Sequence, residues 1–167
     1  EEYNSNLSGE ELSEKTAKTS DDYLLLAENA ETMQLAIKYA EKSLQLDEDN
    51  IDAKVMLAEF STEHTYEMVY KFKELIVYAE KVMKKKGYMN EDSIGSYWGI
   101  VETRPFIRLY SNYLDLLLNC GMILEAKKVA QEIIKYNESD NLGVRYILMH
   151  IYAYLEDEKS ILELHNK

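Results

Sequence analysis

Three histidines are the side chains best suited to metal or acid–base chemistry, and they are far apart: His64, His150 and His165. On a helix end His64 could bind a metal ion together with Glu63 and Glu67. The chain nevertheless lacks the HExxH spacing that places two histidines and a general base on one helix face. We therefore expect no metal site.

Patterns for phosphate binding and for nucleophilic catalysis are also missing. The chain has no glycine-rich phosphate loop and no GxSxG turn. It has 31 acidic residues, but nothing in the sequence marks a pair held for acid–base catalysis. Cys120 is the single cysteine, which excludes an internal disulfide, and it is expected to be a small buried hydrophobic residue. We predict no catalytic residue and no cofactor, so the chain is not expected to be an enzyme.

The acidic balance of the chain bears on its partners. The net charge is −12, and residues 1–50 carry 13 acidic and 4 basic side chains. Phosphate backbones and anionic lipids repel such a surface, so we expect no nucleic-acid or membrane partner. The charge either serves solubility or attracts a basic segment of a partner.

Targeting signals are not visible. No apolar run approaches the roughly 18 residues needed to span a bilayer, and the first residues, EEYNSNLSGEEL, do not resemble a secretory signal. A cytoplasmic location is expected. The chain does not begin with Met, so we expect it to be a piece of a longer protein.

The most regular pattern of apolar residues in the chain lies in residues 102–146. Pro105 suits the first turn of a helix, and apolar residues then recur every three or four positions. Gly121 is expected to end this helix. A second amphipathic helix follows, and the polar turn at 137–141 separates it from a third. The stretch predicts a helical hairpin and the start of the next one.

Similarity between two segments of the chain indicates that such hairpins repeat. The segment 35–59 and the segment 125–150 both contain two alanines four positions apart, then apolar pairs, an acidic Asn-rich turn and a new helix. Repeats of about 34 residues bury their faces against neighbouring repeats. We predict an all-α, right-handed stack of about eight helices in one domain at 20–167, preceded by a polar tail or frayed helix at 1–19.

The middle of the chain departs from this repeat. Residues 65–86 predict one long helix that ends in a run of lysines, which suits the negative end of a helix dipole. Residues 87–101 predict a connector with three glycines. Within it, Tyr97 and Trp98 are expected to fold back over the following hairpin.

The chain resembles tetratricopeptide-repeat proteins over roughly residues 30–155. The small residues that match the crossing positions of that family are Ala36, Ala40, Gly121, Ala126 and Ala130. More narrowly, four segments resemble motifs of bacterial repeat proteins related to the suppression-of-tumorigenicity family: DAKVMLAE at 52–59, WG at 98–99, ETRPFIR at 102–108 and NLGVRY at 141–146. The resemblance implies a tetratricopeptide-like fold and a bacterial origin.

Stacked hairpins place their first helices on a concave surface, which we expect to bind a partner. The side chains predicted to face this groove are Asp52, Val55, Glu59, Arg108, Asn112, Asp115, Asn119, Arg145, Met149 and Tyr152. Two roles are open for three arginines, Arg104, Arg108 and Arg145. They either form ion pairs with Glu102, Glu138 or Asp140 that hold adjacent hairpins together, or they bind an anionic group of a partner.

The predicted function is a non-catalytic scaffold that binds a protein or peptide segment of basic or mixed charge. The alternative is a regulatory or accessory domain of a larger enzyme whose catalytic part lies outside this chain. The chain is expected to be a monomer or a weak homodimer.

Overall fold

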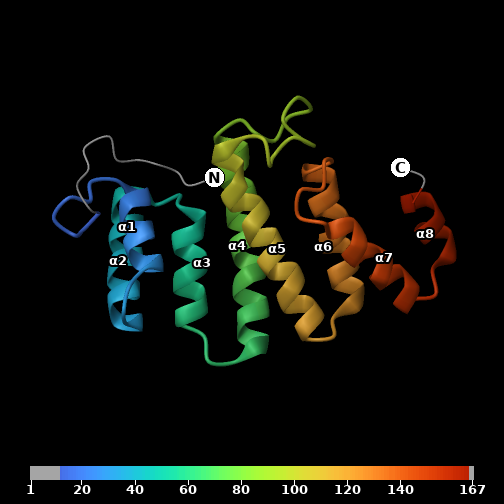
Figure 1. Cartoon of the computed structure of the whole chain (residues 1–167), viewed down its shortest axis with the longest axis horizontal. Helices are drawn as coiled ribbons and strands as arrows, with labels where there is room; N and C mark the ends of the chain where they lie inside the picture. Colours follow the sequence, from blue (N-terminus) through green and yellow to red (C-terminus); the bar gives the residue numbers. More distant parts are fainter. Residues whose placement is uncertain (1–11, 166–167) are drawn as a thin grey trace. The chain divides into compact units, whose positions relative to one another are not determined.

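The computed structural model describes residues 12–165, and their regular structure is entirely helical. This confirms the all-α prediction and the expected number of helices. The described residues form α1 (Ser20–Glu28), α2 (Met33–Leu46), α3 (Ile51–Phe60), α4 (Thr65–Lys85), the short 3-10 helix η1 (Val101–Thr103), α5 (Arg104–Asn119), α6 (Ile123–Tyr136), α7 (Val144–Tyr154) and α8 (Glu158–His165) (Figure 1).

The chain divides after Ser61 into two compact units. The first contains α1 to α3, and the second contains α4 to α8. The expectation of a single domain over 20–167 stays a prediction. Of the polar tail expected at 1–19, residues 1–11 lie outside the described part of the chain.

In the first unit α2 packs between α1 and α3. Ala36 and Ala40 are buried, as expected for small residues at a close helix crossing. Thr19 is the N-cap of α1. The Thr19 hydroxyl accepts from the backbone of Asp22, whose carboxylate accepts from Thr19 N–H, a complete capping box. The hydroxyl of Ser20 takes no part in this cap and contacts another helix instead.

A polar contact joins all three helices of this unit. The Ser20 and Ser43 hydroxyls lie 2.8 Å apart, and Asn50 Nδ2 donates to Ser20 Oγ over 2.8 Å. The Asn50 Oδ1 also accepts from the backbone N–H of Ala53, which caps α3. The two buried side chains of this set, Ser43 and Asn50, are therefore satisfied.

In the second unit each helix packs against the next along the chain, from α4 through α8. The long helix was predicted to within one residue at its end. Gly121 has a φ of +68° in the turn between α5 and α6, as expected for a glycine that ends a helix. Ala126 and Ala130 have no exposed surface, so α6 lies close to its neighbours.

The connector between α4 and α5 is held by Tyr97, which is fully buried. Its ring stacks on Tyr136 with centroids 5.1 Å apart and meets the edge of Phe106 at 5.6 Å. Its hydroxyl donates to the carbonyl of Tyr88 over 2.9 Å. The prediction that this residue folds back over the hairpin is confirmed. The neighbouring Trp98 is partly buried, under the guanidinium of Arg104.

Candidate functional site

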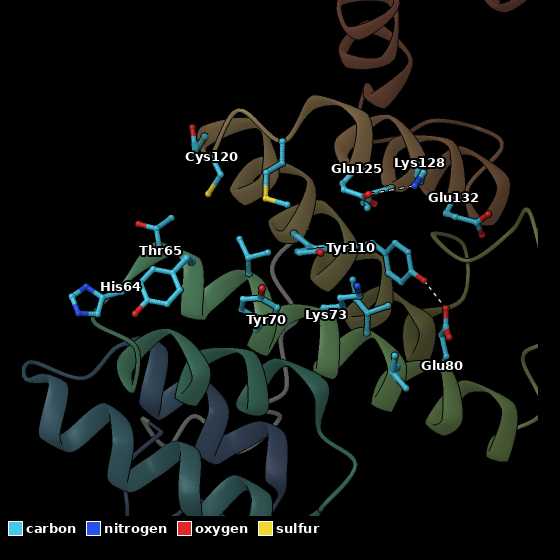
Figure 2. Close-up of a pocket in the computed structure, with 18 residues that line it drawn as sticks. His64, Thr65, Tyr70, Lys73, Glu80, Tyr110, Cys120, Glu125, Lys128 and Glu132 are labelled. Carbon is cyan, nitrogen blue, oxygen red and sulfur yellow. Dashed lines mark hydrogen bonds and ion pairs between the residues drawn. The ribbon is translucent and has the colours of Figure 1, made fainter.

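The second unit contains an open groove of about 1090 Å³. Its residues come from α4 and its N-cap His64, from α5 and α6, and from the turn between the last two. Because α5 packs against both α4 and α6, it forms the floor, and the other two helices form the walls (Figure 2). A concave surface of this size is the usual kind of place for a ligand or a peptide.

The α4 wall is an apolar stripe that the fold leaves uncovered. Tyr66, Tyr70 and Val77 all line the groove and are 63%, 68% and 48% exposed. They are spaced by four and seven residues, so they share one side of the helix. The opposite side carries Phe72, Ala79 and other buried residues that face the core. The helix is therefore apolar on two sides, of which only one is packed.

The other wall carries mostly charged side chains. It begins with Met122, which is 39% exposed, and continues along α6 through Glu125, Lys128 and Glu132. Glu125 pairs with Lys128 over 3.3 Å, and Glu132 pairs with Lys135 over 3.1 Å. Both pairs are exposed to solvent and hold these side chains only weakly.

Tyrosines form the floor, and one of them is tied to the α4 wall. The hydroxyl of Tyr110 donates to Glu80 Oε1 over 2.8 Å, an interaction drawn in Figure 2. Burial and the Glu80 carboxylate raise the pKa of Tyr110 far above its ordinary value. Burial, with the charges of Glu132 and Glu80, raises the pKa of Tyr136 behind it to about 12. Both phenols remain neutral at physiological pH, and the carboxylates of Glu80 and Glu132 contribute to both pKa shifts after burial.

The groove has a distinct chemistry at each end. Figure 2 shows Glu80 and Glu132 at one end and His64 and Cys120 at the other. The acidic end receives one carboxylate from each wall. The other end is bordered by the exposed aromatic ring of Tyr66, stacked on His64 with centroids 5.7 Å apart. A bound segment would thus meet apolar side chains of α4 together with Lys73 and Lys128 along the groove, and two carboxylates at one end.

Among the predicted groove residues, Asn119 lines this groove. The others on α5 are exposed but lie elsewhere: Arg108, Asn112 and Asp115. With 100° per residue they fall about 140° to 200° away from Tyr110, on the opposite face of the helix. Their role in binding stays a prediction.

The remaining predicted residues belong to α3 and α7. Asp52, Val55 and Glu59 lie in the first unit, where partial burial raises the pKa of Glu59 and Val55 is buried in the core. On α7, Arg145 and Met149 are partly buried. Tyr152 is buried, and its hydroxyl accepts from Gln131 Nε2 over 2.9 Å. In this position Tyr152 joins α7 to α6.

Two expectations about single side chains need correction. Cys120 was expected to be buried, but it is exposed, because it follows the last turn of α5 at the rim of the groove. Two of the arginines contact backbone rather than carboxylates. Arg104 Nε donates to the carbonyl of Trp98 over 2.9 Å, and Arg145 Nη2 donates to the carbonyl of Glu138 over 2.9 Å. Asp140 instead accepts from backbone N–H groups at the start of α7.

Apart from Asn119, sequence reasoning missed the residues of both walls and of the floor, and only those on the α4 wall left a readable signal. Tyr66, Tyr70 and Val77 fit the expected helix, but they were not assigned to a binding surface. The available signal was the breadth of the apolar face, since Val69, Phe72, Ile76 and Ala79 already suffice to pack one side. When a helix has apolar residues on more than one side, either all sides are buried in the protein or the uncovered side is a candidate binding surface.

The described residues contain no cluster of three or more His, Cys, Asp and Glu side chains that could hold a metal ion. Between residues 12 and 165 every helix is too short or too polar to cross a lipid bilayer. Comparison with models of protein families, with curated proteins and with solved structures finds no match.

Proposed function

We propose that the second unit is a non-catalytic binding module that holds a segment of a protein or peptide in the groove between α4 and α6. The observation that carries this proposal is the exposed apolar stripe of Tyr66, Tyr70 and Val77 inside a concave surface. Contiguous exposed apolar surface in a hollow is typical of interaction sites. Covering one large apolar side chain contributes about 1.5–3 kcal/mol to binding before ordering costs.

The polar groups of the groove suit recognition better than reaction. Tyr110 has a raised pKa and so cannot serve as a base near neutral pH. Glu125 and Glu132 are engaged with lysines one turn away. The groove could serve a free scaffold or an accessory domain of a larger enzyme, and both uses rest on capture of a partner segment.

The finer fold is part of the same proposal. We place the chain among right-handed, tetratricopeptide-like helical stacks of bacterial, cytoplasmic proteins. Support comes from the packing of each helix against the next within the second unit and from the buried alanines at the predicted crossings, Ala126 and Ala130. The groove between α4 and α6 is the surface that such a module would use.

The test is a peptide-display selection against the full chain, repeated with substituted chains. Tyr66→Ser with Tyr70→Ser should abolish binding of the enriched peptides. The matched control is Tyr146→Ser with Tyr154→Ser, because these tyrosines on α7 are 72% and 74% exposed and do not line the groove. Circular dichroism checks that both pairs fold. Peptides that bind equally well to both substituted chains, or a selection that enriches none, would overturn the proposal.

A further inference from the structure

We infer that the occupant of the groove is an amphipathic α-helix with an apolar stripe and a Lys or Arg that reaches Glu80 and Glu132. The inference rests on the proposed function and adds the conformation and charge of the bound segment. Shape, backbone chemistry and electrostatics support it separately.

The groove has a shape that can accept an α-helix. α4 and α6 both pack on α5 and run in the same direction, since His64 and Cys120 mark one end of the groove and Glu80 and Glu132 the other (Figure 2). Two parallel helices on a third leave a trough that a fourth helix can fill. From His64 to Glu80 the α4 wall rises about 24 Å, which matches a helix of about 16 residues.

The groove lining explains why a helix fits better than an extended strand. An extended segment needs partners for its N–H and C=O groups, but the walls and floor are helices whose backbone groups bond internally. The described residues contain no strand whose edge could pair with a peptide. Asn119 is the one side-chain amide in the lining. A helix satisfies its own backbone and can lay its apolar side on Tyr66, Tyr70 and Val77.

The charge at one end selects a basic side chain. Glu80 projects from α4 and Glu132 from α6, and both lie at the same end of the groove (Figure 2). Glu132 pairs with the exposed Lys135, and Glu80 accepts a hydrogen bond from the neutral hydroxyl of Tyr110. A cation from the occupant would lie between carboxylates of both walls. An acidic or phosphorylated segment would be repelled there.

The experiment uses two displayed libraries against the full chain. One is a 16-residue alanine-based helix with random residues at four stripe positions and at both ends. The other is a random seven-residue segment between two prolines, which is too short to form a stable helix. The helical library should yield binders with large apolar residues in the stripe and Lys or Arg at one end, and the best synthetic peptide should gain helicity on binding.

Charge variants then test the acidic end. Glu80→Gln with Glu132→Gln should weaken the best peptide about two- to thirty-fold, and Gln at 80 still accepts from Tyr110. Glu80→Lys with Glu132→Lys should reverse the preference from a Lys-ended to a Glu-ended peptide. The control is Glu163→Gln, on α8 outside the groove, which should change the affinity less than two-fold.

The outcomes separate this inference from the proposed function. Two outcomes would refute the helical basic occupant and leave the binding module intact. In one, peptides that need Tyr66 and Tyr70 come only from the proline-flanked library. In the other, the charge variants do not change the affinity of the peptides. If neither library yields a peptide sensitive to the tyrosine pair, both fail. A mass that doubles with concentration in wild type but not in Tyr66→Ser with Tyr70→Ser would identify a second copy as the occupant and overturn the inference.

Discussion

Replacement of Tyr97 should show how strongly the connector after α4 is bound to the hairpin. The side chain is fully buried, stacks on Tyr136, meets Phe106 and donates to the Tyr88 carbonyl. Truncation of a buried aromatic residue to Ala costs about 3–5 kcal/mol. Tyr97→Phe keeps the ring and loses one hydrogen bond, which costs about 1 kcal/mol. The two variants therefore separate packing from hydrogen bonding at one site.

Urea unfolding followed by fluorescence measures both variants, because the only tryptophan, Trp98, is the next residue. With an m-value of about 2 kcal/mol/M, Tyr97→Ala should lower the midpoint by about 2 M and Tyr97→Phe by about 0.5 M. Far-UV circular dichroism, which sees the helices of both units, serves as a second probe. The control Tyr154→Ala removes a tyrosine that is 74% exposed and should change the free energy of unfolding by less than about 0.5 kcal/mol.

Two results would refute this reasoning. If Tyr97→Ala lowers the free energy of unfolding by less than about 1 kcal/mol, the aromatic cluster does not hold the connector. If Tyr97→Phe costs as much as Tyr97→Ala, the hydrogen bond to Tyr88 dominates and the ring packing contributes little. Since whole domains are stable by only about 5–15 kcal/mol, a loss of 4 kcal/mol is readily measured.

Three further substitutions test other parts of the structure. Ala130→Leu should destabilise the chain by about 1–3 kcal/mol because the site has no free space, whereas Ala153→Leu on the exposed side of α7 should be nearly neutral in the same urea assay. Gly143→Ala should cost about 1–2 kcal/mol in thermal unfolding, because Gly143 has a φ of +68° that disfavours a Cβ; an unchanged midpoint would contradict the left-handed turn. Glu14, whose pKa is lowered from 4.5 to about 2 by hydrogen bonds from Lys42 and Lys38, should stabilise the fold above pH 4.5 and lose this effect as the pH falls toward 2. The difference in melting temperature between wild type and Glu14→Gln should therefore vanish at pH 2 and be present at pH 7.

Much of the secondary structure was predictable because its signals are local. The spacing of apolar residues located α4, and Pro105 and Gly121 mark the start and the end of α5 closely. The exact start of α1 cannot be read from local signals because Thr19, Ser20 and Asp21 can all cap a helix. Only the contact of Ser20 with Ser43 of α2 shows which hydroxyl is used elsewhere.

The candidate site was harder to predict, since a pattern of apolar residues does not say which of them a neighbouring helix will cover. Leu117 and Cys120 both lie near the end of the apolar run of α5, yet Leu117 is buried and Cys120 is exposed at the groove. The arginine contacts depend likewise on where backbone carbonyls lie, as the bond from Arg104 to the carbonyl of Trp98 shows. Such positions follow from the path of the connector and not from residue spacing.

The amino-acid sequence by itself determined that the described residues are helical, where α4 and α5 lie to within a residue or two, and that Ala36, Ala40, Ala126 and Ala130 are buried. These features depend on propensity, capping and the 3.6-residue period, all of which act over a few neighbouring residues. Only the tertiary structure decided that Tyr66, Tyr70 and Val77 face an open groove while Phe72 is buried. Both sides of α4 are apolar, so their exposure depends on where α5 and α6 pack, and that is set by contacts between residues far apart in the chain.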